Sequence, residues 1–333
     1  MSRRAASVAV LTARTAVTRS LADLNTGEIV LVACSGGADS LALAGTVAWA
    51  AQRDGREVVA VVVDHGLQEG SAAIADQAAA TCRALGVHRA VVVPVTVGRS
   101  GGPEAAARDA RYAALESVAV ETRAATILLG HTREDQAETV LLRLARGSGA
   151  RSLAGMRERS GPWRRPFLTL PRSLVRTAAE ELLAAVGAVP WDDPHNEDPA
   201  YARVRVRRLL DQLTDAIGPG AVLGLTRSAD LLRDDADALE ELATQAHNQL
   251  VTMGEGECSA DGAALARLSR AVRTRLIRMM CLQCGCPAED LTVDHVRSID
   301  ALVTDWHGQG PTSLPGGVLA HRTYGRLCLR PPD

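Results

Sequence analysis

Short runs of β-branched residues alternate with alanine-rich segments of helical length through the first part of the chain. The runs are Ile29–Cys34, Val58–Asp64, Arg89–Val95 and Thr126–Gly130. Strands that alternate with helices pair in parallel, and a strand as continuously apolar as the second run is buried on both faces. The sequence therefore predicts an α/β fold with a doubly wound, Rossmann-like parallel sheet, which binds ligands at the carboxyl ends of its strands.

The pattern changes after Ile217, where a Gly-Pro-Gly sequence interrupts the chain. Long helical patterns follow at Val222–Leu250, Gly262–Leu282 and Ala288–Val303, and the Gly/Pro-rich stretch Ser313–Arg330 is typical of a hairpin. We therefore expect a first domain over residues 1–217 and a smaller, mostly helical domain over residues 218–333 that ends in a hairpin.

Composition narrows the class of protein. Seven cysteines at scattered spacings, the lack of an apolar run long enough to span a bilayer, and the lack of a secretory leader pattern indicate the reducing cytoplasm and no membrane partner. The stretch Arg3–Ala22 has the pattern of an amphipathic helix instead. All 37 basic residues are arginine, so this chain has no lysine to clamp a phosphate.

A loop rich in serine and glycine directly follows the first predicted strand and opens a helix. It consists of Ser35, Gly36, Gly37, Ala38, Asp39 and Ser40. Backbone N–H groups and the positive end of the helix dipole converge there, which predicts an anion-binding site. The glycines allow phosphate oxygens to approach, the serines add hydroxyl donors, and Asp39 is placed to hold Mg²⁺. The spacing matches neither the Walker loop nor the dinucleotide fingerprint; the alternative is a plain turn that caps a helix.

Two further polar groups follow predicted strand ends. Asp64 and His65 end the second strand, where His65 either faces a nucleotide or is a hydrogen-bonded turn residue. His131, Asp135 and Glu138 follow the fourth strand, with the two carboxylates three residues apart on one face of a helix. An imidazole and two carboxylates can hold Mg²⁺ or accept a proton there. The alternative is that acidic residues in a first helical turn only complement the helix dipole.

Three motifs together resemble the tRNA(Ile)-lysidine synthetases, a family of N-type ATP pyrophosphatases. They are the serine-glycine loop, the stretch 64–67 (DHGL) and, most specific of the three, residues 130–149 (GHTREDQAETVLLRLARGSG). Two more segments are similar to the family, residues 104–112 (EAAARDARY) and 191–208 (WDDPHNEDPAYARVRVRR). The chain departs from the family pattern at Val204, where an asparagine is usual, and at Gln68, where an arginine is usual.

The resemblance implies a PP-loop fold, a reaction and a set of site residues. Members of the family use ATP to adenylate the wobble cytidine of the isoleucine tRNA with a CAU anticodon, and free L-lysine then displaces AMP to form lysidine. The implied ATP-binding residues are those of the loop together with Asp64 and His65. The implied catalytic residues are Asp39, His131, Asp135 and Glu138, with Asp39 and Asp135 as Mg²⁺ ligands. The implied contacts to tRNA or phosphate are Arg111, Arg203 and Arg205.

An arginine-rich span favours RNA binding next to this site. Residues 143–208 hold 13 arginines against seven acidic residues, in a chain whose net charge is −2. The alternative is a solvated surface in a chain that lacks lysine. The sequence leaves the oligomeric state open between monomer and homodimer, and we expect the second domain to bind tRNA.

Two rival functions share the loop. A tRNA 2-thiolase would need cysteines in the ATP domain for sulfur or an iron–sulfur cluster, and this domain has only Cys34 and Cys82. A non-catalytic nucleotide sensor would not need both Asp39 and the Asp135/Glu138 pair.

A cluster of cysteines in the second domain raises the question of zinc. Cys281, Cys284 and Cys286 lie near His295, but no second paired motif has the usual spacing. We therefore do not expect a metal there.

Overall fold

A computed structural model describes residues 6–66, 68, 70–98, 102–147, 149–254 and 256–331. Leu67 and Ser148, which fall within two of the motifs, lie outside the described residues. The chain divides into two compact units, Met1–Asp230 and Leu231–Asp333, and passes from one to the other within helix α9 (Ala221–Leu250). The boundary expected from the sequence lies at the Gly-Pro-Gly break just before this helix.

The first unit is built on a six-stranded sheet. Its strands are β1 (Ile29–Cys34), β2 (Glu57–Asp64), β3 (Arg89–Pro94), β4 (Thr126–Leu128), β5 (Arg159–Ser160) and β6 (Trp163–Arg164). Their order is β3-β2-β1-β4-β6-β5, and every pair is parallel except the β5–β6 hairpin. The predicted parallel sheet is confirmed. The sequence missed β5 and β6, because two-residue strands carry no periodic pattern.

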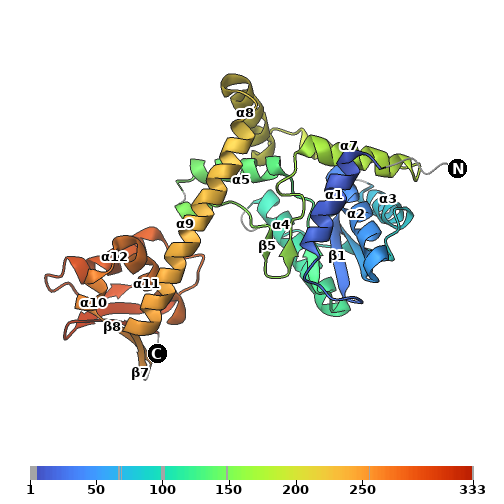
Figure 1. The fold of residues 1–333 in the computed structure, drawn as a ribbon. Coiled ribbons are helices and arrows are strands. Elements are labelled where there is room, and N and C mark those ends of the chain that lie inside the picture. Colours follow the sequence, from blue (N-terminus) through green and yellow to red (C-terminus); the bar gives the residue numbers. More distant parts are fainter. Residues whose placement is uncertain are drawn as a thin grey trace. The chain divides into compact units, whose positions relative to one another are not determined.

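Helices cover both faces of this sheet (Figure 1). Val30 and Val32 of β1 belong to a core shared with α1 (Val8–Ser20), α2 (Ala38–Asp54), α3 (Ser71–Ala84) and α7 (Arg172–Ala184). Leu31, between them, belongs to the core on the other face, which packs against α4 (Pro103–Thr122). Successive side chains of a strand point to opposite faces, so a continuously apolar strand fits a sheet that is covered on both.

Three further helices belong to this unit, and the first and last of them carry residues of the candidate site. They are α5 (Arg133–Ala145), α6 (Ala150–Leu153) and α8 (Ala202–Ile217). None of the described helices in the chain is long and apolar enough to cross a bilayer.

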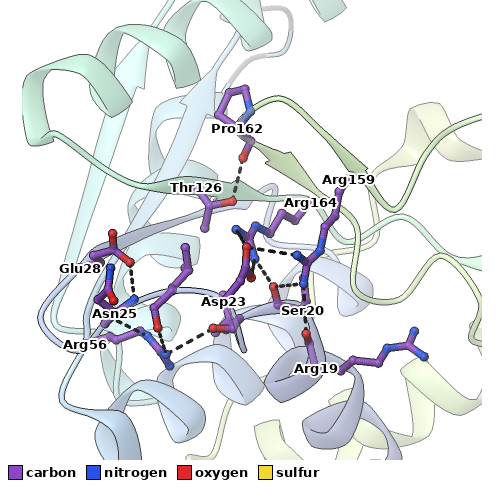
Figure 2. Close-up of polar contacts among 12 residues, drawn as sticks. Arg19, Ser20, Asp23, Asn25, Glu28, Arg56, Thr126, Arg159, Pro162 and Arg164 are labelled. Atoms are coloured by element: carbon purple, nitrogen blue, oxygen red, sulfur yellow. Dashed lines mark hydrogen bonds and ion pairs between the residues drawn. The ribbon is translucent and has the colours of Figure 1, made fainter. Parts of the chain in front are cut away.

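Arginines hold the carboxyl end of α1 in place (Figure 2). Arg164 of β6 donates to the backbone oxygen of Ser20 and to both carboxylate oxygens of Asp23, at 2.6 and 3.0 Å. Arg56 donates to the backbone oxygen of Leu24 at 2.7 Å, and Arg159 donates to that of Ser20 at 3.0 Å. These cations satisfy carbonyl groups that the end of a helix leaves without partners.

The second unit packs helices on one antiparallel sheet. Its helices, besides the end of α9, are α10 (Gly262–Arg267), α11 (Arg270–Gln283) and α12 (Val293–Thr304). Its strands are β7 (Val251–Gly254), β8 (Glu257–Asp261), β9 (Thr312–Ser313), β10 (Leu319–Thr323) and β11 (Arg326–Arg330), in the order β7-β8-β11-β10-β9. β10 and β11 form a hairpin within the stretch 313–330. The β7–β8 hairpin was missed, because β8 (ECSAD) has no β-branched or aromatic residue.

Candidate active site

The serine-glycine loop lies where the winding of the sheet reverses. β1 has β2 on one side and β4 on the other, and the chain visits β4 only after β2 and β3. In doubly wound sheets this switch point opens a crevice at the carboxyl ends of the strands. Residues 35–40 follow β1 at this position and lead into α2.

Close packing shapes the loop. Gly36 has a φ of +83°, and a Cβ there would come within 3.2 Å of the Ala78 Cβ. The Trp191 N–H donates to the Gly36 oxygen at 2.9 Å, which ties the loop to the segment before α8. At the end of β4, a Cβ on Gly130 would lie 3.1 Å from the backbone oxygen of Asp39. The two glycines therefore allow three chain segments to meet at this point.

The sequence predicted that both serine hydroxyls donate to a phosphate, but the Ser40 hydroxyl is bonded within the loop. The Ser40 hydroxyl donates to the Gly37 oxygen at 2.9 Å and accepts from the Ser35 N–H at 3.2 Å, so it braces the turn. The Ser35 hydroxyl lies 3.3 Å from it. Gly37 is the N-cap of α2 and brings no side-chain oxygen to the first turn. The first N–H groups of a helix have no intrahelical partner, so this turn offers them to an anion.

Asp39 lies in the first turn of α2, and one of its carboxylate oxygens accepts no hydrogen bond among the described residues. Its Oδ1 is buried and has no hydrogen-bond partner among the described residues, while its Oδ2 lies 3.9 Å from Arg172 Nε. Burial raises the pKa of Asp39 to about 6, although Arg172 opposes the shift. A cation at Oδ1 would stabilise the charged carboxylate.

His131 lies between the end of β4 and α5, and its side chain is half-buried. Its Nδ1 has no partner among the described residues. Burial lowers the pKa of His131 to about 3; Asp135 opposes this shift, and nearby arginines reinforce it. The imidazole is therefore neutral near pH 7 and can accept a proton or a hydrogen bond.

The two predicted carboxylates of α5 are both held by arginines. Asp135 accepts from the Thr132 N–H and hydroxyl at 2.7 and 2.8 Å with one oxygen, and from Arg172 Nη2 at 2.7 Å with the other. Burial would raise the pKa of Asp135, but Arg172, His131 and these hydrogen bonds together lower it. Glu138 is only 3% exposed and contacts Arg172 at 3.3 Å and Arg207 Nε at 3.0 Å.

Arg172 is the central residue that sequence reasoning missed. It opens α7 and lies within 4 Å of three carboxylates, those of Asp39, Asp135 and Glu138. Burial alone would lower the pKa of Arg172, but these carboxylates, Asp135 foremost, raise it. One signal was available: a cation in the first turn of a helix opposes the dipole, so it indicates an acidic partner from elsewhere.

The end of β2 contributes a turn residue and a free imidazole. Asp64 accepts from the Gly66 N–H at 3.0 Å and so shapes the turn. His65 Nδ1 is buried without a partner among the described residues. Burial lowers the pKa of His65; Arg111 adds to the shift, and Asp64 opposes it. His65 therefore does not behave as a hydrogen-bonded turn residue.

Arg111 of α4 is half-buried, and its buried Nε has no partner in the described part of the chain. Burial lowers the pKa of Arg111, Tyr112 opposes this shift, and Arg108 and Arg203 reinforce it. Arg108 donates to the Tyr112 hydroxyl at 3.1 Å, yet its Nη1 is also buried without a described partner. Guanidinium groups with buried nitrogens of this kind favour an anionic ligand.

The two arginines predicted at the start of α8 point apart. α8 is a regular helix, on which residues two apart face different directions. Arg203 pairs with Glu104 of α4 at 3.4 Å, whereas Arg205 is exposed and donates to backbone oxygens just before the helix. Val204, at the position where the family has an asparagine, is buried and packs as an apolar residue. Arg207, four residues after Arg203, is the arginine of α8 that pairs with Glu138.

Buried polar atoms without partners gather in this region from several separate segments of the chain. In this region they are Asp39 Oδ1, His65 Nδ1, Arg108 Nη1, Arg111 Nε, His131 Nδ1 and Arg165 Nε; Arg14 Nε of α1, whose guanidinium lies over the Trp49 ring, is a further such atom away from the loop. Buried polar groups of folded proteins nearly always have hydrogen-bond partners, so such a concentration indicates a ligand site. Most of the atoms belong to cations or imidazoles, which suits a ligand rich in phosphate.

Comparison with known proteins agrees with this geometry. The PP-loop domain family matches residues 11–213, and the TilS substrate binding domain matches residues 261–328. The chain is 56% identical to the tRNA(Ile)-lysidine synthase of Thermobifida fusca, over 95% of this chain and 96% of that protein. It is 51% identical to the enzyme of Streptomyces coelicolor, over 92% and 86%.

The chain belongs to the tRNA(Ile)-lysidine synthase family. The resemblance found in the motifs is thus confirmed, as is the prediction of a PP-loop ATP-binding enzyme of the ligase type that modifies tRNA. A solved structure, the U34-tRNA thiolase of Methanococcus maripaludis with its [4Fe-4S] cluster, shares the fold with a TM-score of 0.55 and 19% identity, over 68% of this chain and 79% of that one.

Proposed function

We propose that this protein uses ATP to join free L-lysine to C2 of the wobble cytidine in the isoleucine tRNA with a CAU anticodon. The reaction would pass through a tRNA adenylated at O2 of that base, release pyrophosphate and then AMP, and leave lysidine. Family membership supports the reaction class. The observation that supports it for this chain is the group of arginines and histidines around the loop whose buried nitrogen atoms have no partner among the described residues.

The loop and α4 provide for the phosphates of ATP. The first turn of α2 offers backbone N–H groups, and the glycine at its N-cap leaves them uncovered. Arg111 lies close enough to His65 to lower the pKa of that imidazole, so we assign both side chains to the same phosphates. Arg111 would stabilise negative charge that develops when the α–β phosphate bond breaks.

Asp39 has an oxygen that could bind Mg²⁺, whereas in this structure Asp135 has none. Asp39 has a buried oxygen with no described partner, whereas both oxygens of Asp135 are engaged by Thr132 and Arg172. Mg²⁺ typically takes one or two carboxylates beside the substrate phosphates. When bound, it would neutralise charge on the leaving pyrophosphate. Asp135 would join only if Arg172 released it.

The α5 carboxylates suit the amine substrate. Asp135 and Glu138 both form ion pairs with the Arg172 guanidinium in this structure, and a lysine ammonium has the same charge. The amine must lose a proton before it attacks C2. Asp135 or Glu138 would collect it, and His131, which is neutral near pH 7, would accept a hydrogen bond from the amine.

Arginines on α8 and in the span 143–208 would hold the RNA backbone. Arg203 lies close enough to His131 and Arg111 to affect the pKa of each, so we assign it to the phosphates nearest the reacting base. Arg205, which is exposed, would contact phosphates farther away. Because tRNA is the substrate and all seven cysteines are free thiols, we place the enzyme in the cytoplasm.

A direct assay tests the function. The protein is incubated with ATP, Mg²⁺, labelled lysine and either isoleucine tRNA or methionine tRNA, both with a CAU anticodon. We expect label only in the isoleucine tRNA, with one AMP formed per lysine joined. Binding of ATP without AMP formation would support a nucleotide sensor, and sulfur transfer without lysine transfer would support a thiolase.

A further inference from the structure

Three side chains of metal-binding type converge on the sheet of the second unit. Glu257 of β8, His321 of β10 and Cys328 of β11 bring an oxygen, a nitrogen and a sulfur within 4.8 Å of one another. In the part of the chain that the structure describes, no other group of three such residues meets this spacing. The site lies in a different unit from the PP-loop and takes no part in the proposed reaction.

Strand register brings the three together. His321 pairs directly with Cys328 across the β10–β11 hairpin. Cys328 pairs with Ser259 of β8, and Glu257 lies two residues before Ser259, hence on the same face. The neighbouring residues Cys258, Leu327 and Leu329 point to the opposite face and fill the helical core.

Cys328 is nevertheless shielded from water. It is only 3% exposed, although it points away from the main core of the unit, while Glu257 and His321 are half-buried. The sheet therefore presents one covered thiol between a carboxylate and an imidazole on rigid, paired strands.

We propose that Glu257, His321 and Cys328 bind a zinc ion, with water in the fourth position. Zinc accepts this mixed set of sulfur, nitrogen and oxygen ligands in tetrahedral geometry at about 2.0–2.3 Å. Ligands at those bond lengths lie roughly 3.5 Å apart, and the three atoms lie within 4.8 Å of one another, so they need to close by at most about 1.3 Å, a shift that side-chain rotation can supply. A thiolate and a carboxylate together balance the charge of Zn²⁺.

The charges around Cys328 fit this assignment. The Glu257 carboxylate supplies negative charge beside the Cys328 thiol. Binding of zinc would release the thiol proton to solvent as the S–Zn bond forms. The Arg326 guanidinium donates to the Thr252 and Ser259 hydroxyls at 2.9 and 3.0 Å, which keeps it on the β7 side.

The cysteine cluster noted in the sequence has no such arrangement. Cys281, Cys284 and Cys286 are buried in the helical core, and burial raises the pKa of all three thiols. His295 caps α12 instead, where its Nδ1 accepts from the Thr292 N–H at 3.2 Å.

Cobalt titration of the reduced, chelator-treated full-length protein tests the proposal. Co²⁺ takes the same ligands and reports a thiolate bond through a near-ultraviolet charge-transfer band. We expect the band to saturate at one Co²⁺ per chain, to disappear on addition of Zn²⁺, and to be lost in Cys328→Ser. His321→Ala and Glu257→Gln should each weaken Co²⁺ binding at least about tenfold.

Matched variants in the same unit serve as controls. His307→Ala, Glu289→Gln and Cys286→Ser change the same residue types elsewhere and should keep the band. Zn²⁺ should raise the melting temperature of the native protein and of these controls but not of Cys328→Ser, and circular dichroism verifies that each variant is folded. A band that survives Cys328→Ser, or no band with native protein at about 1 mM Co²⁺, overturns the proposal.

Discussion

The first unit contains two groups of arginines that differ in how fully their hydrogen bonds are satisfied. At the end of α1, Arg56, Arg159 and Arg164 donate to backbone oxygens, and Arg164 also forms a two-bonded pair with Asp23 (Figure 2). Around the PP-loop, Arg108 and Arg111 keep buried N–H groups with no partner among the described residues.

We interpret this difference as one between structural arginines and the arginines that we propose bind ligand. In a chain whose basic residues are all arginine, composition and charge cannot distinguish the two groups. Hydrogen-bond satisfaction can, because a buried donor without a partner costs folding free energy and persists only where something else uses it. Substitution of an arginine near the loop should therefore lower activity and keep stability. Substitution of an arginine at the end of α1 should lower stability and keep the activity of the folded protein.

The largest effect is expected at Asp39. Asp39→Ala should lower lysine transfer about a thousandfold, because it removes the carboxylate whose free oxygen faces the phosphate site. Its melting temperature should not fall, since burial already disfavours the charged carboxylate. Near-normal transfer with an unchanged melting curve would remove Asp39 from the site.

Arg111 and Arg164 test the comparison directly. Arg111→Ala should lower lysine transfer about a hundredfold without loss of stability, since it deletes a cation whose buried Nε has no described partner. Arg164→Ala should leave the activity of folded protein unchanged and lower the free energy of unfolding by about 2 kcal/mol, because it breaks bonds to Ser20 and Asp23. Reversal of the two outcomes, measured by steady-state kinetics and urea unfolding, would break the distinction.

Asp135 shares one feature with each group of arginines: its hydrogen bonds are satisfied, and it belongs to the candidate site. Asp135→Asn keeps an oxygen for the Thr132 N–H but weakens the pair with Arg172. Turnover should fall at least about a hundredfold if the carboxylate acts on the amine substrate. If thermal denaturation shifts and single-turnover rates do not, Asp135 only caps α5.

Arg203 and Arg205 should contribute separately to tRNA binding, because they point in different directions on α8. Each single change to alanine should lower the slope of log affinity against log salt by roughly one, and the double change by roughly two. Filter binding across a salt series measures this. An unchanged slope in the double variant would mean that these arginines brace the helix instead.

The smallest effect is an acid dependence at Asp23. The Arg164 hydrogen bond lowers the pKa of Asp23 to about 2, below the usual value of about 3.9 in an unfolded chain. The folded state therefore gains stability above about pH 4 and loses it as the pH falls through about 2. Asp23 is half exposed, so the gain is below about 1 kcal/mol. The melting temperatures of native protein and Asp23→Asn should converge across that interval; a constant difference would contradict the assignment.

Local patterns in the sequence determined the parallel sheet, the position of the loop and the family. β1 to β3 coincide with predicted runs to within a residue at either end, and β4 begins at the predicted Thr126, because β-branched runs and helical periodicity are properties of short segments. The PP-loop was visible for the same reason, since one strand, two glycines and one helix start suffice to make it.

Only the tertiary structure decided which polar residues meet and which are satisfied. Arg172 follows Asp135 by 37 residues and Asp39 by 133, yet it lies within 4 Å of both. Arg203 and Arg205 look like a pair in the sequence and diverge on the helix, while His321 and Cys328 look unrelated and face each other across a hairpin. Ion pairs, metal ligands and unpaired buried groups depend on distances between elements, and those distances are set by packing of the whole unit.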